Sequence, residues 1–117
     1  MLNSLRLSRV CGTRGLASMP LNYRVTVPET ARPGPPLVLL HGLFGSSSNF
    51  GTIARKCASI LGVPVILPDL RNHGTSPWSD DMSFDSMAAD LLAVLDAEGC
   101  ERAVLCGHSL GGKVQPG

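Results

Sequence analysis

The stretch Ala103-Val104-Leu105-Cys106-Gly107-His108-Ser109-Leu110-Gly111 decides the fold of this chain. Its first four residues form an unbroken apolar run, which is typical of a strand buried on both faces of a parallel sheet. The next five match the pattern G-x-S-x-G. Directly after a buried strand, this pattern predicts a sharp turn that exposes the Ser109 hydroxyl as a nucleophile. Alone, the pattern also describes a glycine-rich turn that happens to contain serine, but the preceding strand favours the nucleophile.

Two further apolar runs predict strands beside 103–106. They are residues 37–40 (LVLL) and 63–67 (VPVIL). Residues 21–27 (LNYRVTV) alternate and predict a fourth strand. Because helical patterns separate the apolar runs, the order is β-β-α-β-α-β, and the fold class is α/β.

The two intervening helices are predicted from apolar periodicity. The first covers 49–61, ends at Gly62, and has the apolar face Ile53, Ala54, Cys57, Ile60 and Leu61. The second is N-capped by Ser83, and Gly99 follows its end. Its apolar stripe is Phe84, Met87, Ala88, Leu91, Leu92 and Leu95.

Loops that follow the strands carry the other candidate site residues. His41-Gly42-Leu43-Phe44-Gly45 can direct backbone N–H groups at a developing oxyanion. The expected pair of donors is the N–H of Leu43 and the N–H of Leu110, with Phe44 as the alternative to Leu43. The polar turn 69–76 is expected to lock the same edge of the sheet.

The segments HGLFGSSSNF (41–50), DLRNHGTSP (69–77) and GHSLGGK (107–113) together resemble the α/β-hydrolase fold superfamily. The resemblance runs from about residue 20 to 113 and is strongest to a branch of mitochondrial and bacterial esterases. It implies the N-terminal portion of an α/β-hydrolase fold over 20–114, a mostly parallel sheet with helices on both faces. It also implies serine hydrolysis of acyl esters, including lipid esters such as diacylglycerol, with no metal or organic cofactor. Serine at the turn disfavours epoxide and haloalkane hydrolysis, because those enzymes place Asp there.

The rest of a catalytic triad is missing from the sequence. Triad partners in this fold follow in the order Ser, Asp or Glu, His, but the eight residues after Ser109 include no acid and no histidine. Upstream, His41 and His108 are poor substitutes for the base, and His73 is the least unfavourable. We therefore expect an inactive, truncated or alternatively spliced product with a divergent tail at 115–117. The alternative is a non-catalytic isoform that binds a partner or is degraded.

The small number of residues after Ser109 also affects the expected stability of the chain. The run 103–106 is expected to have a bare outer edge and no covering helix after it. On that basis the chain is not expected to fold as a stable monomer.

Residues 1–19 have the composition of a mitochondrial transit peptide. They contain Arg6, Arg9 and Arg14 and no acid, and the first acid of the chain is Glu29. This predicts a mitochondrial location, in the matrix. The alternative is an N-terminal tail that carries no address.

Overall composition narrows the function classes. The chain has 117 residues, a formal charge of +1 and 4% aromatic residues, which gives no support to nucleic-acid binding. No apolar run approaches the ~18 residues of a membrane span, and no G-x-G-x-x-G or P-loop indicates a nucleotide site. The cysteines, Cys11, Cys57, Cys100 and Cys106, are expected to be reduced and not to bind metal.

Overall fold

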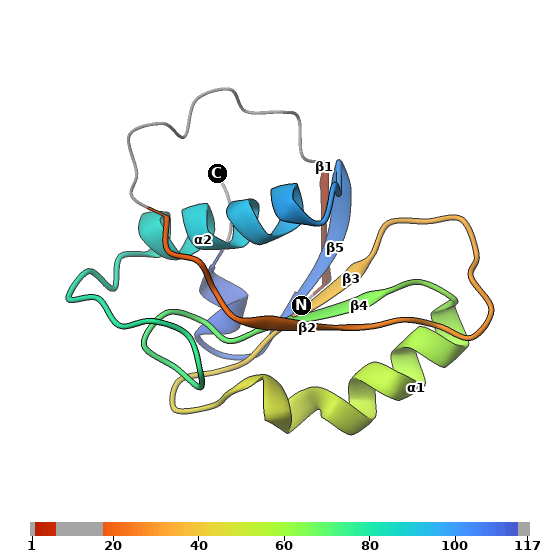
Figure 1. Ribbon diagram of the computed structural model, residues 1–117, viewed down its shortest axis with the longest axis horizontal. Helices are drawn as coiled ribbons and strands as arrows, with labels where there is room; N and C mark the ends of the chain where they lie inside the picture. The colour runs from red at the N-terminus through yellow and green to blue at the C-terminus, as the bar shows by residue number, and fades with distance from the viewer. Residues whose placement is uncertain (1, 7–17, 115–117) are drawn as a thin grey trace.

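The computed structural model describes residues 18–114 and the backbone of residues 2–6 (Figure 1). The elements are β1 (Leu2–Arg6), β2 (Tyr23–Thr26), β3 (Leu37–Leu40), the short 3₁₀ helix η1 (Ser47–Phe50), α1 (Gly51–Leu61), β4 (Val65–Pro68), α2 (Phe84–Ala97), β5 (Arg102–Gly107) and the 3₁₀ turn η2 (Gly111–Lys113). The four strands expected from the sequence are confirmed, with small shifts at their ends. The divergent tail 115–117 and most of the segment 1–19 lie outside the described residues.

The five strands form one mixed sheet in the order β1-β5-β3-β4-β2. The central strands β5, β3 and β4 are parallel, and the outer strands β1 and β2 are antiparallel to their neighbours. The carboxyl ends of the three central strands therefore meet at one end of the sheet. The loops that leave them lie together there (Figure 1).

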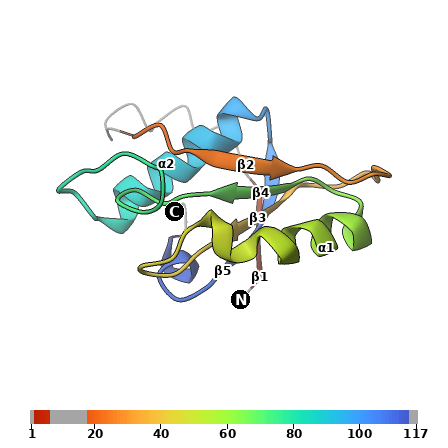
Figure 2. The same ribbon diagram turned by 60° about the horizontal axis from the view of Figure 1, so that its bottom comes forward.

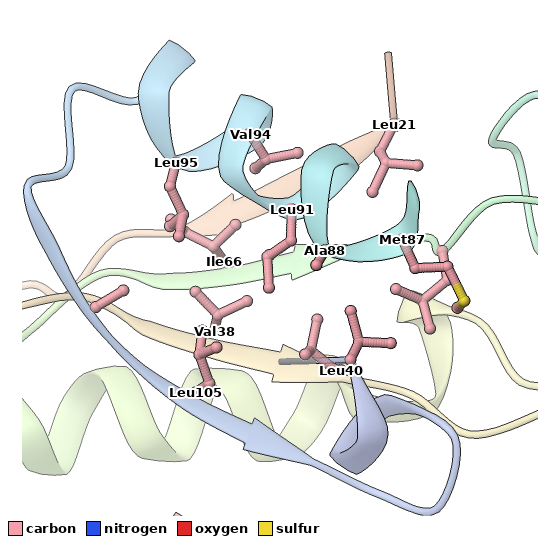
Figure 3. Close-up of a cluster of buried hydrophobic side chains, with 13 residues drawn as sticks. Leu21, Val38, Leu40, Ile66, Met87, Ala88, Leu91, Val94, Leu95 and Leu105 are labelled. Carbon is pink, nitrogen blue, oxygen red and sulfur yellow. The ribbon is translucent and has the colours of Figure 1, made fainter. Parts of the chain in front are cut away.

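Helices cover both faces of the sheet, with α2 on one side and α1 on the other (Figure 2). Because strand side chains alternate between faces, the same strands supply two cores. The core under α2 includes Val38, Leu40, Ile66, Leu91, Leu95 and Leu105 (Figure 3). The core under α1 consists of Leu37, Leu39, Ala54, Ala58, Val65 and Leu67. An α/β fold class with helices on both faces is thus confirmed.

The caps of the two helices are also as expected. The Ser83 hydroxyl accepts a hydrogen bond from the Ser86 N–H at 3.3 Å, which caps the first turn of α2. Gly62 ends α1 in the left-handed conformation, with φ of 69°.

The expected apolar face of α1 is confirmed for Ala54 and Cys57 and is wrong for its three larger residues. Ala54 and Ala58 face the sheet and are buried, whereas Ile53 and Leu61 are about half exposed and Ile60 is 72% exposed. Small residues at i and i+4 let the helix axis approach the sheet closely. The larger residues are consequently displaced to the flank and the outer surface of the helix.

The expected bare edge of β5 is also wrong. Strand β1 pairs with it in antiparallel register, from Leu2 opposite Cys106 to Arg6 opposite Arg102. An unpaired edge of a buried strand presents free N–H and C=O groups, and an extended segment satisfies them. Leu105 and Val114 are buried in the core under α2, while Val104 and Leu110 are partly buried.

Candidate active site

Ser109 occupies a strained turn between β5 and η2. Its φ is 53°, in the left-handed region that non-glycine residues rarely adopt. The turn is closed by hydrogen bonds from the Gly111 N–H to the His108 carbonyl at 3.0 Å and from the Gly112 N–H to the Ser109 carbonyl at 3.1 Å. The Ser109 side chain is exposed. A strained, exposed serine directly after a strand of the central sheet is the geometry of a nucleophile elbow.

Two glycines make this turn sterically possible. A Cβ on Gly107 would overlap the carbonyl group of Gly111, and a Cβ on Gly111 would overlap the carbonyl oxygen of Leu40 at the end of β3. The G-x-S-x-G spacing therefore reflects a backbone packed against itself and against the neighbouring strand.

The loop after β3 lies beside Ser109. A Cβ added to Gly42 would lie 3.4 Å from the Ser109 Cβ. The Gly45 N–H bonds the Gly42 carbonyl at 3.0 Å, which closes a turn around Leu43 and Phe44. Phe44 has φ of 62° and is 93% exposed.

Three backbone donors in these two loops have no acceptor. Within residues 18–114, the N–H groups of Leu43, Phe44 and Leu110 make no hydrogen bond. The structure thus places the loop that carries Leu43 and Phe44 next to the turn that carries Leu110.

A carboxylate ties the loop after β3 to the loop after β4. Asp69 accepts hydrogen bonds from the Ser47 N–H at 2.7 Å and from the N–H and hydroxyl of Thr75, each at 2.9 Å. Burial alone would raise the pKa of Asp69, but these bonds outweigh it and lower the pKa to about 2. Gly74 is required beside it, because its φ is 52° and a Cβ there would overlap the carboxylate. The turn 69–76 therefore holds this edge of the sheet, as expected, through the charged carboxylate of Asp69.

The two buried histidines have structural partners. The Leu70 N–H donates to Nε2 of His41 at 3.0 Å, so Nδ1 carries the proton and donates to the Gly42 carbonyl at 2.8 Å. Burial lowers the pKa of His41, which keeps the ring neutral. Nδ1 of His73 bonds the Arg71 carbonyl at 2.8 Å, and the His73 ring contacts the His41 ring at a tilt of 53°, with centroids 5.1 Å apart.

Ser109 consequently lacks a base in this structure. No side chain in residues 18–114 hydrogen-bonds its hydroxyl. His41 uses both ring nitrogens to hold the loops around the site. Among the same residues there is also no group of three or more His, Cys, Asp or Glu side chains placed to hold a metal ion.

A family model described as the alpha/beta hydrolase fold matches residues 35–114, from just before β3 to just after η2. The chain belongs to the α/β-hydrolase fold family. This match contains all three loops around Ser109.

Similar hydrolases are known by sequence and by structure. The chain is 53% identical over 85 residues to the sn-1-specific diacylglycerol lipase ABHD11 of Xenopus tropicalis, covering 73% of this chain and 27% of that protein. It is 42% identical over 95 residues to esterase YbfF of Escherichia coli, covering 81% and 37%. A solved marine microorganism esterase superposes with a TM-score of 0.70 at 41% identity, covering 83% and 35%. The chain thus spans between 27% and 37% of the length of these hydrolases.

Sequence reasoning missed several residues that shape the surroundings of Ser109. It identified the Ser109 turn and the loop 41–45, but not the close approach of Gly42 to Ser109. It also missed the hydrogen bond from the Ser47 N–H to Asp69 and the buried pair of Arg71 with Asp90, whose Nε–Oδ2 distance is 2.7 Å. The only available signal was the presence of Asp69 and Arg71 in this polar segment. Their partners, Ser47 and Asp90, lie 19 or more residues away in the chain.

Proposed function

We propose that this chain supplies the nucleophile and the oxyanion donors of a serine ester hydrolase. Ser109 attacks the ester carbonyl, and the N–H groups of Leu43 and Leu110 bind the oxygen as it becomes negative. The strained φ of Ser109 beside Gly42 is the observation that carries the proposal. The assignment of Leu43 and Leu110 as donors is supported by their N–H groups, which make no hydrogen bond within residues 18–114. Phe44 remains the alternative to Leu43, because its N–H is also without an acceptor there. No metal or organic cofactor takes part.

The proposed substrate is a lipid acyl ester such as a diacylglycerol. Similarity to the Xenopus lipase supports this class. The surface near the site agrees with it, because Leu43 and Phe44 expose apolar side chains on the loop next to Ser109. The proposed location is the mitochondrial matrix, on the composition of residues 1–19. No helix in the described part of the chain is long and apolar enough to cross a bilayer.

The isolated chain is proposed to turn over esters negligibly. Ester hydrolysis by serine needs a base that removes the hydroxyl proton, and none of residues 18–114 supplies one to Ser109. This observation equally favours a second candidate, a non-catalytic isoform that binds a partner or is degraded. Ser109-dependent turnover by the isolated chain would exclude that second candidate.

A chimera tests the catalytic proposal directly. Residues 20–114 replace the matching segment of the Xenopus tropicalis lipase, so that the remainder of that protein completes the domain. We expect hydrolysis of p-nitrophenyl butyrate, and of a diacylglycerol emulsion if the lipid class is right. Ser109→Ala in the chimera should reduce the rate by ~10⁴-fold or more.

Ser59→Ala is the matched control, because Ser59 is an exposed serine on α1 away from the three loops. It should leave the rate unchanged. A folded chimera without Ser109-dependent activity would contradict the proposal. Activity on the small ester but not on diacylglycerol would contradict only the lipid class.

A further inference from the structure

The two helices that cover the sheet carry opposite charges. Helix α1 contains two cations and no acid, whereas α2 contains three acids and no cation. One of the three acids is buried in an ion pair. The exposed charges of the two helices are Arg55, Lys56, Asp85 and Asp96. Because α1 and α2 lie on opposite sides of the sheet (Figure 2), the molecule is basic on one side and acidic on the other.

Two strands add exposed cations to the side that α1 covers. Arg24 on β2 is the register partner of Leu67, which belongs to the core under α1. Residues directly opposite on neighbouring strands share a face of the sheet. Arg102 lies two positions before Val104 on β5, and Val104 packs against the same core. Because strand side chains alternate, Arg102 is on that face as well.

A further cation lies at the end of α1. The Arg32 N–H donates to the Gly62 carbonyl at 2.7 Å, and the Arg32 side chain lies directly against Gly62. Within residues 18–114, none of the cations on this side forms a salt bridge. Arg55 donates only to the Thr52 hydroxyl of its own helix, at 3.3 Å. Residues 18–62 contain four cations and a single acid, Glu29. The positive charge on this side is therefore free to attract an anionic partner.

Large apolar side chains lie among these charges. Ile60 is 72% exposed, Ile53 is 50% exposed and Leu61 is 47% exposed. Lys56 follows Ile53 by three residues and precedes Ile60 by four, so the three side chains are neighbours along the helix surface. A helix that lies in a membrane interface combines apolar residues, which enter the headgroup region, with cations, which attract anionic lipids. The outer surface of α1 has this composition.

We propose that the basic face of α1, formed by Ile53, Arg55, Lys56, Ile60 and Leu61, docks on the surface of an anionic lipid bilayer. The helix lies along the bilayer, with its isoleucines among the headgroups and its cations at the lipid phosphates. The acidic side that carries α2 faces water. This binding does not depend on the chemistry of Ser109, so it is tested without turnover.

A second copy of the chain is a poorer occupant of the basic face. The acidic side of another molecule would complement the cations, which favours contact between α1 of one copy and α2 of the next. Among the large apolar residues of α2, however, only Phe84 is exposed. Ile53 and Ile60 would therefore lie largely against polar surface, whereas a bilayer accepts both the apolar and the charged side chains.

The loops near Ser109 form a competing apolar surface. Phe44 is 93% exposed and Trp78 is 78% exposed, which exceeds any residue of α1. Asp80 and Asp81 follow Trp78 closely in the chain, and both are exposed. These carboxylates would repel an anionic bilayer, and α1 has none. Charge therefore favours α1 as the docking surface.

Co-sedimentation of the full chain with vesicles tests the proposal. We expect binding to an equal mixture of phosphatidylcholine and phosphatidylglycerol, little binding to phosphatidylcholine alone, and release at about 1 M salt. Lys56→Glu should weaken binding by more than about fivefold, and Ile60→Ser by about tenfold. Because both side chains are exposed, both variants should keep the helical circular dichroism of the unaltered chain.

Lys113→Glu is the matched control for charge. It makes the same exchange at an exposed lysine of η2, whose neighbours Leu110 and Val114 pack against the core under α2. Phe44→Ser is the control for exposed apolar area on the competing loops. Both controls should bind the mixed vesicles as the unaltered chain does.

Fluorescence of Trp78, the single tryptophan of the chain, reports which surface meets the bilayer. If α1 docks, Trp78 stays in water and its emission should not change when vesicles are added. A blue shift on binding, together with weaker binding by Phe44→Ser, would assign the contact to the loops and overturn the proposal.

The arginines of residues 1–19 are present in every variant, so a difference between variants reports on α1 alone. Binding that neither Lys56→Glu nor Ile60→Ser weakens, but that is lost when Arg6, Arg9 and Arg14 are replaced by alanine, would overturn the proposal. A folded chain that does not bind the mixed vesicles would also overturn it. Self-association that Lys56→Glu abolishes, without vesicle binding, would assign the basic face to a second copy instead.

Discussion

The Ser47 backbone N–H donates to the Asp69 carboxylate at 2.7 Å, which joins the loop after β3 to the loop after β4 through one charged group. The same carboxylate holds Thr75. The loop that carries Leu43 and Phe44 is thereby held from both sides, since His41 also binds the Leu70 N–H.

We expect Asp69→Asn to destabilise the chain by about 2 kcal/mol at pH 7. The folded pKa of Asp69 is lowered to about 2 from an ordinary value of about 3.9. A lowered pKa gives stability that is present above the unfolded value and is lost as pH falls from about 4 towards 2. Urea unfolding at pH 7 and at pH 2 measures this difference, which should nearly vanish at the lower pH. Asp80→Asn is the matched control on an exposed carboxylate of the same loop, and an equal loss there would contradict the assignment.

We expect Ser109→Gly to be more stable than Ser109→Ala by about 1 kcal/mol. Glycine adopts the positive φ of this turn without a steric cost, whereas alanine keeps the strain. Thermal unfolding of the two variants gives the comparison. At the helical Ser59 the order should reverse, because glycine costs about 1 kcal/mol relative to alanine inside a helix. The same order at both positions would show that Ser109 is not strained.

We expect Arg102→Glu to strengthen the pairing of β1 with β5. Arg6 and Arg102 are register partners, and like charges opposite each other weaken an antiparallel pair. An opposite charge should improve stability by about 0.2–1 kcal/mol and slow amide exchange in β5. Arg24→Glu, on the other outer strand, is the control and should leave exchange in β5 unchanged. Faster exchange in β5 of the Arg102 variant would contradict the register.

We expect a fluorescent fusion of residues 1–25 to enter mitochondria. Replacing Arg6, Arg9 and Arg14 with alanine should abolish import, because mitochondrial targeting segments are rich in arginine and poor in acidic residues. Arg24→Ala is the control in the same fusion and should import normally. Cytosolic fluorescence of the unaltered fusion would refute the address.

Local patterns predicted the parts of the fold that depend on local sequence. Apolar runs located β3, β4 and β5, and the pattern around Ser109 located the strained turn, because strand burial and a tight turn impose residue types within a few positions. The face of α1 could be predicted only in part in this way. Ile60 and Ala58 both satisfy helical periodicity, and the choice depends on how closely the helix approaches the sheet.

Long-range pairs were beyond the reach of sequence patterns. Strand β1 pairs with residues about 100 positions away, and nothing within residues 2–6 specifies that partner. Ser47 with Asp69 and Met19 with Asp90 are similar cases, since each joins a backbone N–H, which every residue except proline has, to a distant carboxylate. The acids were visible in the sequence, and their partners were not.

Strand β1 gives the first residues of the chain two incompatible uses. A targeting segment must be accessible to be recognised, but the backbone of residues 2–6 is hydrogen-bonded along β5 once the sheet has formed. Folding therefore makes part of the proposed targeting segment inaccessible. Import therefore competes kinetically with the pairing of β1 and β5. A chaperone that delays this pairing would favour import. Rapid folding would retain the protein where it was made.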